Sequence, residues 1–530
     1  MKNNNKYTVI ILLLIVFASC KKSFETLSKN PNKPSEVPAS LLLNGVLNDI
    51  YDAPYTMQER WCQYYCCNYD YYGNNRYDFG SQDDYYNTLN NVNKMEAAAL
   101  ATGGETINPY EALGNFFRAY MFTKMSLEYG DIPVDDALKG LSNLQPAYNT
   151  QKEVFIKAFG WLEKANTDLS QLIANPSSNT TNGQVLKGDI YFNNDLAKWQ
   201  KAVNTLHLRL LLACSMKADD AGLNIKTQFN TIVNNPDKYP VMENSGDNLQ
   251  YTYIHPTNDY PMNPSNFGFD ALRYNTSATY ISLLTKLRDP RVFVTAEPAI
   301  ALIKGNVKPT DFEAFAGADP GEDQGVMYLK TNSGNYSLIN RHHFYETYTG
   351  EPSIQIGYPE LCFNIAEAIN RGWINKGPLG AAEDYYKAGI ISSMDFYGVP
   401  VSGSFTAYFL KPGASLGTSN TYTIDVNFDN YYAQPLVKYA GNNTNGLTQI
   451  LQQKYLALFR HSGLESYFTW RRTGVPAFNT GTGTGNSERI ALRFQYPGNE
   501  KTANATNYNA ALQAQYGGND DINAKMWLLK

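Results

Sequence analysis

Residues 150–176, TQKEVFIKAFGWLEKANTDLSQLIANP, decide the fold class of this 530-residue chain. Thr150 and Glu153 have the spacing of a capping box, in which each side chain satisfies a main-chain N–H group at the start of a helix. Apolar residues then recur at spacings of three and four, the period of a helix buried along one face. They are Phe155, Ala158, Leu162, Ala165, Leu169 and Leu172. Asn175 and Pro176 end this pattern, so the stretch predicts a long amphipathic helix.

The same rule extends to other parts of the chain. Asp195 is a suitable N-cap for a second helix with the same periodicity, which runs to Ala213. Further helices are expected over residues 110–129, 359–371, 381–396 and 447–461. The pair 360–371 and 381–397, joined by a glycine-containing turn, predicts an antiparallel hairpin. Several hairpins of this size predict an all-α fold of tetratricopeptide-like helical hairpins.

Four long insertions separate these helices, at residues 68–93, 237–280, 301–357 and 398–446. Loops of that length in a compact domain are usually functional or disordered, and their content of Tyr, Phe and Gly argues against disorder. We therefore expect the insertions to carry a binding surface. Chain length alone would suggest about three domains. Because no Pro-, Ser- or Gly-rich linker separates such units, we predict one domain over residues 20–530.

The first 19 residues have the features of a secretory signal. Lys2 and Lys6 precede about ten nearly uninterrupted apolar positions, too few to span a bilayer, which takes roughly 20. The run Phe17-Ala18-Ser19-Cys20 is similar to the lipobox of bacterial lipoproteins, in which cleavage leaves a lipidated cysteine. We expect residues 1–19 to be removed and Cys20 to carry the lipid anchor. A plain signal peptide is the alternative.

Composition argues against several functions. The net charge is −5 and no basic run is present, so nucleic acid is not an expected partner. Cys62, Cys66 and Cys67 lack the spacing of a metal site. In a helix, a bridge between Cys62 and Cys66 would be strained, and we expect the five cysteines after Cys20 to be buried free thiols.

Catalytic motifs are also missing from the sequence. The five histidines form no HExxH motif or GxSxG-linked arrangement, and His207 is expected to be a core or rim histidine. The glycines at 481–485 lack the Lys-Ser/Thr of a phosphate loop. A calcium ion at residues 319–323 is a minor alternative, because the spacing is not that of an EF-hand. We therefore predict no catalytic residues, no metal and no cofactor.

An ordered set of short blocks resembles a known family. The blocks are Asn30-Pro31-Asn32, Tyr129-Gly130-Asp131-Ile132-Pro133, Gly188-Asp189-Ile190-Tyr191, Asp195-Leu196-Ala197-Lys198-Trp199, Tyr358-Pro359-Glu360-Leu361-Cys362-Phe363, Lys454-Tyr455-Leu456-Ala457-Leu458-Phe459 and Phe468-Thr469-Trp470-Arg471-Arg472-Thr473-Gly474. Together with the lipobox, they resemble the SusD/RagB nutrient-binding outer-membrane lipoproteins of Bacteroidetes, in particular the SusD-like branch.

This resemblance implies an all-helical, tetratricopeptide-like scaffold that caps a SusC-like TonB-dependent β-barrel transporter at the outer membrane. It implies a lipid anchor whose acyl chains include palmitate, and display at the cell surface. Members capture oligosaccharides, or peptides in some branches, and deliver them without chemical change. Because Trp470-Arg471-Arg472 belongs to a scaffold block of this family, the resemblance also implies a structural role for that run. Two functions of other classes stay open: a lipid-anchored glycan hydrolase and a purely structural helical-repeat adaptor.

Two insertions contain candidate ligand-binding residues. A sugar site needs flat aromatic faces beside amide and guanidinium hydrogen-bonding groups, because pyranose rings present apolar C–H faces ringed by hydroxyls. The first candidate set is Tyr69, Tyr71, Tyr72, Asn74, Asn75, Arg76 and Tyr77. The second set is Phe267, Phe269, Arg273 and Tyr274. The alternative for the first set is structural packing, and for the second it is contact with the transporter.

Overall fold

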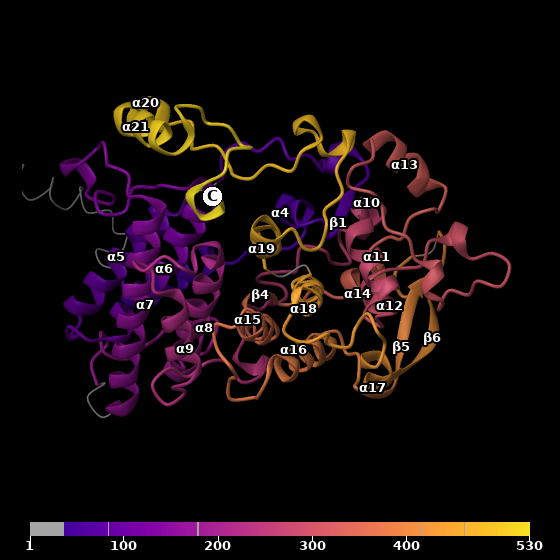
Figure 1. Ribbon diagram of the computed structural model, residues 1–530, viewed down its shortest axis with the longest axis horizontal. Helices are drawn as coiled ribbons and strands as arrows, with labels where there is room; N and C mark the ends of the chain where they lie inside the picture. Colours follow the sequence, from indigo (N-terminus) through magenta and orange to yellow (C-terminus); the bar gives the residue numbers. More distant parts are fainter. Residues whose placement is uncertain (1–36, 83, 177–179, 414, 460–461) are drawn as a thin grey trace, which may run out of the picture.

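The computed structural model describes residues 37–82, 84–176, 180–413, 415–459 and 462–530 (Figure 1). The signal segment and Cys20 lie outside the described residues. The helices of the first half are α3 Ala39–Asp49, α4 Met57–Trp61, α5 Tyr86–Ala101, α6 Pro109–Tyr129, α7 Gln151–Ala174, α8 Leu196–Ala213, α9 Ile225–Val233 and α10 Phe267–Asp270. Those that follow are α11 Ala278–Lys286, α12 Val292–Thr295, α13 Gln324–Asn332, α14 Arg341–Tyr345, α15 Tyr358–Asn370, α16 Ala382–Phe396, α17 Phe428–Tyr432, α18 Thr444–Ala457, α19 Glu465–Thr473, α20 Glu500–Ala503 and α21 Ala505–Tyr516.

The capping box at the start of α7 is confirmed. The Thr150 N–H donates to the Glu153 carboxylate at 2.8 Å, and the Glu153 N–H donates to the Thr150 hydroxyl at 3.3 Å. Leu162 and Leu169 on the apolar face are fully buried. In α8, Asp195 caps the helix through the N–H groups of its second and third residues. Local sequence rules therefore account for the ends and the buried faces of both helices.

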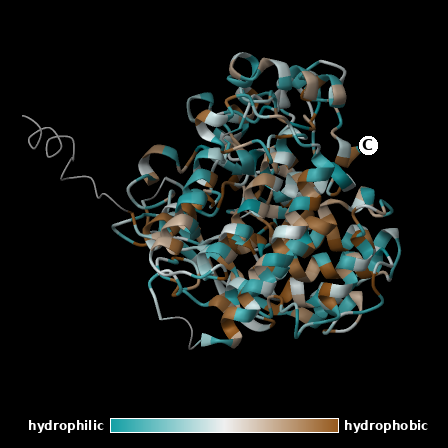
Figure 2. Ribbon diagram, turned by 90° about the vertical axis from the view of Figure 1, so that its left-hand side faces the viewer, coloured by the Kyte–Doolittle hydropathy of each residue, from teal (hydrophilic) through white to brown (hydrophobic). Residues whose placement is uncertain are grey.

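Packed helix pairs build the scaffold, which confirms the predicted all-α, tetratricopeptide-like fold class. Helices α3, α5, α6, α7 and α8 pack in succession at the left of Figure 1. Helix α8 then packs against α15, which pairs with α16 and α18. Figure 2 shows both hydrophobic and hydrophilic residues along helices of this part, as expected for helices buried on one face. Within the described ranges, no helix combines the length and apolar character that a bilayer crossing requires.

The strands form three two-stranded antiparallel ladders. Strand β1 (Tyr65–Cys67) pairs with β3 (Tyr274–Thr276), and β2 (Leu249–Tyr251) pairs with β4 (Ser353–Ile356). Strands β5 (Ser402–Leu410) and β6 (Ser419–Asn427), of nine residues each, form a hairpin at the right of Figure 1. The insertion predicted at 398–446 is therefore a hairpin followed by the short helix α17.

Other predicted boundaries are also corrected. The insertion predicted at 68–93 ends earlier, since α5 begins at Tyr86. This helix start has no side-chain cap, so the rules for recognising a helix N-terminus in the sequence do not detect it. Helix α4 ends at Trp61 and Tyr65 begins β1, so a helix does not continue from Trp61 to Tyr65. The prediction for the cysteines is confirmed. The five cysteines of the described ranges are buried and free.

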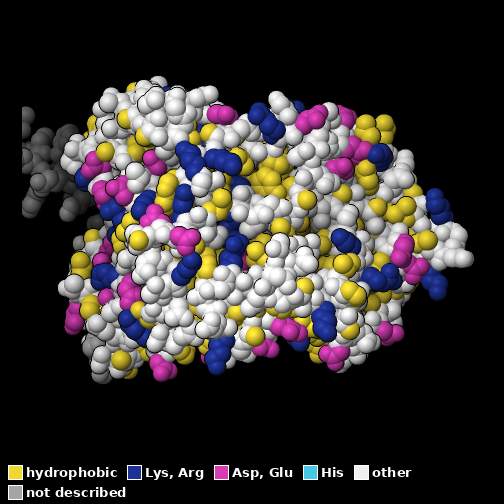
Figure 3. Space-filling model, viewed as in Figure 1, with side chains coloured by type: hydrophobic (Ala, Val, Ile, Leu, Met, Phe, Trp, Pro, Cys, Tyr) yellow, Lys and Arg dark blue, Asp and Glu magenta, His cyan; other side chains and the backbone are white. Residues whose placement is uncertain are grey.

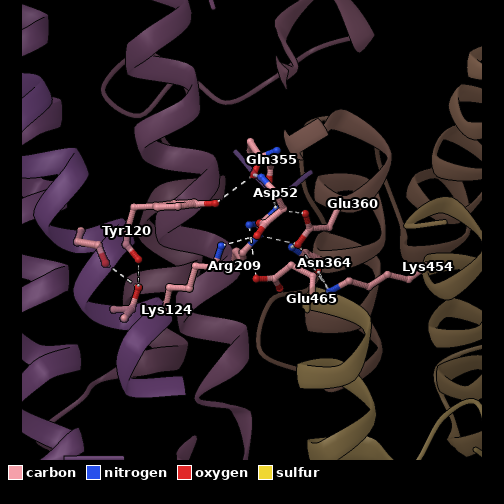
Figure 4. Close-up of polar contacts among 11 residues, drawn as sticks. Asp52, Tyr120, Lys124, Arg209, Gln355, Glu360, Asn364, Lys454 and Glu465 are labelled. Carbon is pink, nitrogen blue, oxygen red and sulfur yellow. Dashed lines mark hydrogen bonds and ion pairs between the residues drawn. The ribbon is translucent and has the colours of Figure 1, made fainter. Parts of the chain in front are cut away.

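Buried ion pairs join the helical layers at the centre of the molecule (Figure 4). Arg209 of α8 donates from Nε to Glu360 of α15 at 2.8 Å, and its Nη1 lies 3.6 Å from Glu465 of α19. Lys454 of α18 donates to Asn364 at 2.8 Å. Two cavities border this cluster, with volumes of about 30 and 20 Å³. Because such volumes fit a water molecule and not a sugar ring, the cluster is a structural element.

The Trp470-Arg471-Arg472 run has the structural role predicted for it. Trp470 stacks on Phe478 with ring centres 4.9 Å apart. Arg471 donates to the main-chain carbonyls of Leu492 and Leu127, both at 2.8 Å. Arg472 pairs with the buried carboxylate of Glu367 at 2.7 Å. These contacts attach α19 to the helical scaffold and to the C-terminal segment.

Candidate ligand-binding surface

A short ladder between β1 and β3 brings the two predicted aromatic insertions together. Cys67 pairs with Tyr274, so the residues just beyond the ladder, Asn68 and Arg273, lie opposite each other. The Asn68 N–H donates to the Arg273 carbonyl at 3.0 Å, and the Asn68 amide group donates to the Leu272 carbonyl at 3.0 Å. Two stretches about 200 positions apart in the sequence thereby form one surface.

Three tyrosines and an arginine make up the centre of this surface. The guanidinium carbon of Arg273 lies 5.0 Å from the ring centre of Tyr69 and 5.7 Å from that of Tyr72, within cation–π range. Tyr71 contacts Tyr72 edge to face at 5.2 Å. Tyr71 is 82% exposed and Tyr69 is 42% exposed. We call Tyr69, Tyr71, Tyr72 and Arg273 the aromatic surface.

Tyr328 of α13 extends the aromatic surface. Its ring centre lies 5.6 Å from that of Tyr69. Sequence reasoning missed this residue, although Tyr328 lies in the predicted insertion at 301–357 and its neighbours Val326 and Leu329 are exposed. Figure 3 shows hydrophobic side chains gathered at the upper right of the molecule, where Figure 1 places α13. The signal available in the sequence was the position of Tyr328, beside Val326 and Leu329, in an insertion expected to carry a binding surface.

Tyr71 and Tyr72 lie in a 3₁₀ turn, η1 (Asp70–Tyr72), which directly follows Tyr69 and is held in place by several contacts. The Tyr72 hydroxyl donates to the Phe269 carbonyl at 2.6 Å. Gln324 of α13 donates from Nε2 to the carbonyls of Cys67 and Gly73, at 3.0 and 2.7 Å. Gly73 has a φ of +137°, and a Cβ there would meet the Arg60 guanidinium. Glycine is required at this position for both reasons.

Asn75 belongs to this support and not to the exposed surface, which corrects its assignment as a ligand contact. Its side-chain oxygen accepts from the Cys67 N–H at 2.8 Å, and its Nδ2 donates to the Cys67 carbonyl at 2.9 Å. The side chain is buried and both ends of its amide are used. The Asn75 side chain therefore satisfies both main-chain groups of Cys67, as the main chain of an adjacent strand would do.

Two predicted rings lie in the core, where they cannot stack on a ligand. Tyr77 is 0% exposed, its hydroxyl donates to the Trp61 carbonyl at 2.8 Å, and the Thr484 carbonyl accepts from its N–H. Tyr274 is buried within β3. Both residues are removed from the candidate set.

The remaining candidates lie at the margins. Phe269 is 72% exposed, whereas Phe267 is partly buried and meets Tyr345 edge to face at 5.7 Å. Arg76 is exposed and paired with Asp78 at 2.5 Å. Asn74 accepts from the Arg76 N–H at 3.0 Å. Phe269 therefore joins the aromatic surface through the Tyr72 hydrogen bond. The Arg76 carbonyl in addition accepts from Trp61 Nε1 of α4 at 2.8 Å, which ties this loop to the scaffold.

The arrangement suits stacking with hydrogen bonding. Exposed tyrosine rings offer flat apolar faces, their hydroxyls donate and accept, and the Arg273 guanidinium supplies donors in a fixed plane. A ligand ring bearing hydroxyl groups at its edge matches this combination. The Cys67 thiol lies beneath, where burial raises its pKa, so it is a poor nucleophile.

The histidines and acidic clusters elsewhere have structural contacts. His207 packs on Phe159 with ring centres 5.3 Å apart, and burial lowers its pKa to about 4. Asp319 accepts from the Gly321 N–H, Asp323 caps α13, and Glu322 accepts from Tyr336. Among the residues that the structure describes, no group of three or more His, Cys, Asp or Glu could hold a metal ion.

Comparison with known proteins identifies the family. The SusD-like family model described as "Starch-binding associating with outer membrane" matches residues 31–497. The chain belongs to this SusD-like family, a class of carbohydrate-binding proteins associated with the outer membrane. The resemblance found in the sequence is confirmed. No curated protein matches the chain.

Solved structures show the same fold. A SusD homologue from Bacteroides fragilis is 29% identical, with a TM-score of 0.79, and the match covers 93% of this chain and 100% of that one. A second SusD homologue from the same species is 28% identical, with a TM-score of 0.75 and the same coverage. A chitin-binding SusD homologue from Flavobacterium johnsoniae is 18% identical, with a TM-score of 0.65, over 93% and 98% of the two chains. At that identity the last likeness concerns the fold alone.

Proposed function

We propose that this protein is an outer-membrane lipoprotein that captures oligosaccharides on the aromatic surface and delivers them, chemically unchanged, to a SusC-like TonB-dependent transporter. The observation that carries the proposal is the position of Arg273 over Tyr69 and Tyr72, next to the exposed ring of Tyr71. Rings that are exposed and held by their neighbours bind a sugar face without first having to be ordered. Family membership supports a carbohydrate ligand.

Capture without catalysis is favoured over hydrolysis, because the family model that matches the chain is described as starch-binding. A glycosidase needs two carboxyl groups on either side of the scissile bond, about 5 to 10 Å apart. Asp270, three residues before Arg273, accepts a hydrogen bond from the Tyr345 hydroxyl at 2.6 Å, and burial raises its pKa. Asp270 is therefore the residue to test as a general acid if turnover is found.

Purified protein incubated with a panel of oligosaccharides and peptides tests the ligand class. Maltoheptaose and chitohexaose represent starch and chitin, and extended peptides represent the alternative ligand. Calorimetric titration measures binding, and chromatography of the recovered ligand detects cleavage. Saccharide that binds and is recovered intact supports the proposal. Cleavage products would favour the hydrolase, and binding of peptides alone would favour a peptide carrier.

The proposed lipid anchor and the transporter partner need tests in cells. Wild-type protein is expected in the outer-membrane fraction, labelled by a palmitate analogue and accessible to protease added to intact cells. Cys20→Ala is expected to release the protein from the membrane. Affinity purification from solubilised outer membranes is expected to recover a TonB-dependent barrel. Unlabelled wild-type protein in the soluble fraction would contradict the anchor without bearing on saccharide binding.

A further inference from the structure

A hollow of about 550 Å³ lies beside the β5–β6 hairpin, away from the aromatic surface. Its walls come from β6, from α17 and from the segment around residues 288–312. In Figure 1 the hairpin and α17 lie at the lower right, whereas α10 and α13 lie above them. The volume falls within the range of about 300–1,000 Å³ that is typical of small-molecule sites.

The free edge of β6 borders this hollow. Main-chain bonds from Phe428 N–H to the Val401 carbonyl and from Lys411 N–H to the Thr418 carbonyl mark the two ends of the ladder. In an antiparallel pair, successive residues direct their N–H and C=O groups alternately toward and away from the partner strand. This alternation points the main-chain groups of Thr423 and Asp425 away from β5, on the side of the hollow.

Polar side chains surround these main-chain groups. Thr423, Asp425 and Asn430 are exposed and line the hollow. Asn427 also lines it, and its Oδ1 accepts from the Asn430 N–H at 2.8 Å, which leaves its Nδ2 group as a donor. The hollow therefore offers hydroxyl, amide and main-chain groups, both donors and acceptors, within a few residues of one another.

An arginine stacked on an aromatic ring forms the opposite wall. The guanidinium carbon of Arg288 lies 4.7 Å from the ring centre of Phe312. Arg288 also pairs with Glu313 at 3.2 Å, outside the lining. The charged residues that line the hollow are Arg288 and Asp425, one of each sign, so the lining has no net charge that would select an ionic ligand.

We propose that this hollow is a second saccharide-binding pocket, which takes a neutral hexose unit of a longer chain. The proposal rests on the saccharide-binding function proposed above, and it adds a site that shares no residue with the aromatic surface. Stacked Arg288 and Phe312 provide a flat wall for the C–H face of a sugar, while Thr423, Asp425 and Asn430 hydrogen-bond its hydroxyls. Two sites on one protein let a polysaccharide bind at two points, which raises its apparent affinity.

Hydrogen exchange of the full-length protein tests both sites in one experiment. With saturating maltoheptaose or chitohexaose, main-chain amides of residues 69–73 and of residues 421–427 are expected to exchange more slowly. Protection of residues 69–73 alone would overturn the second pocket and leave the proposed function standing. Protection of neither region would overturn both. Protection of β6 by an extended peptide but not by a saccharide would identify the edge as a peptide site and overturn the proposal.

Substitutions test the pocket independently. In a Tyr72→Ala and Arg273→Ala background, residual saccharide binding is expected, and adding Phe312→Ala or Asn430→Ala should weaken it about five- to tenfold, where tenfold equals about 1.4 kcal/mol. Thr421→Ala is the control, because Thr421 lies on the same exposed face of β6 but does not line the hollow. Equal binding by the pocket variants and the control, with unchanged melting temperatures, would overturn the pocket.

Discussion

The Tyr72 hydroxyl donates a 2.6 Å hydrogen bond to the main-chain carbonyl of Phe269, 197 positions further along the chain. The ring of Tyr72 therefore has two roles, since it also lies under the guanidinium of Arg273. A ring that is both held in place and exposed to ligand should respond differently to the loss of the hydroxyl and to the loss of the ring.

Substitution of Tyr72 separates these roles. Tyr72→Phe keeps the ring but removes the hydrogen bond that holds it, which is worth about 0.5–1.5 kcal/mol to the fold, so saccharide binding should weaken by at most that amount. Tyr72→Ala should weaken it by about 1–3 kcal/mol. Calorimetric titration measures both. Tyr77→Phe is the control, because the Tyr77 hydroxyl bonds to Trp61 in the core, and its binding should match wild type. Equal losses from Tyr72→Phe and Tyr77→Phe would contradict this view.

Asn75 should be a positioning residue whose loss lowers both stability and binding. Asn75→Ala leaves the buried Cys67 N–H without its acceptor, which should lower the free energy of unfolding by about 1–3 kcal/mol. Urea unfolding measures this change. Asn74→Ala is the matched control, because the Asn74 side chain accepts one exposed hydrogen bond and its loss should have a smaller effect. A stable Asn75→Ala variant would show that Gln324 alone holds Cys67 in place.

Glu367 should make stability depend on acid pH. Burial alone would raise its pKa, but the charges of Arg472 and Arg371 outweigh burial and lower the pKa from 4.5 to about 2. Because the folded-state pKa is the lower one, this contribution is complete above about pH 4.5 and is lost as the pH falls toward 2. Glu367→Gln at pH 7 should lower the free energy of unfolding by about 3–5 kcal/mol.

The effect of Glu367→Gln should shrink as the pH approaches 2, where wild type also loses the charge. Urea unfolding at pH 7, 4 and 3 follows this trend. Glu243→Gln is a suitable control, since Glu243 is exposed and pairs with Lys201 at the surface. Its effect should stay below about 1 kcal/mol. A pH-independent difference between Glu367→Gln and wild type would refute the assigned charge.

Asp131 should produce the opposite dependence. Burial raises its pKa from 3.8 to about 6, and the hydrogen bond from the Gln151 N–H opposes that shift only in part. The fold therefore favours the protonated form, and stability falls as the pH rises from about 4 through 6. Asp131→Asn keeps an acceptor for Gln151 and should stabilise the protein at pH 7 by about 1–3 kcal/mol, with little change at pH 4.

Thermal melts of the wild type and of Asp131→Asn between pH 4 and 7 check this prediction. Asp135→Asn is the comparison of opposite sign, because contacts with Lys157 and Asn149 lower the pKa of the exposed Asp135 carboxyl. Removal of that charge should slightly destabilise the protein at pH 7. A destabilised Asp131→Asn at pH 7 would mean that the charged form has a compensating partner.

The helical scaffold could be predicted because its signals are local. The Thr150 and Glu153 capping pair is three residues apart, and the apolar faces of α7 and α8 recur every three or four residues. The β5–β6 hairpin had a signal of a different period, with Phe405, Ala407 and Phe409 alternating with polar residues. The helical period does not detect this alternation, so the stretch is assigned to a loop unless the two-residue period of a strand is also considered.

The ligand surface could be predicted only in part because its geometry depends on distant contacts. Sequence composition selects Tyr69, Tyr71 and Tyr72 in one insertion and Arg273 in another as candidate ligand contacts, but it does not show that β1 and β3 bring the two insertions together. Tyr77 belongs to the same tyrosine-rich stretch, yet it is buried by later parts of the chain. Its N–H bonds to the Thr484 carbonyl, and two residues further on Phe79 stacks on Phe494 with ring centres 4.2 Å apart. Burial caused by a segment some 400 residues away leaves no trace in a local pattern.

Because β1 pairs with β3, a chain whose synthesis stops before residue 274 cannot form this ladder. The three tyrosines of the aromatic surface lie before residue 73, but Arg273 and Tyr328 come much later in the chain. The Tyr77 N–H bonds to the carbonyl of Thr484, which is synthesised later still. A prematurely ended product would carry the tyrosines without their arginine. Such a fragment would lack the complete surface proposed to bind saccharide, so under that proposal saccharide binding requires a chain that extends at least through Tyr328.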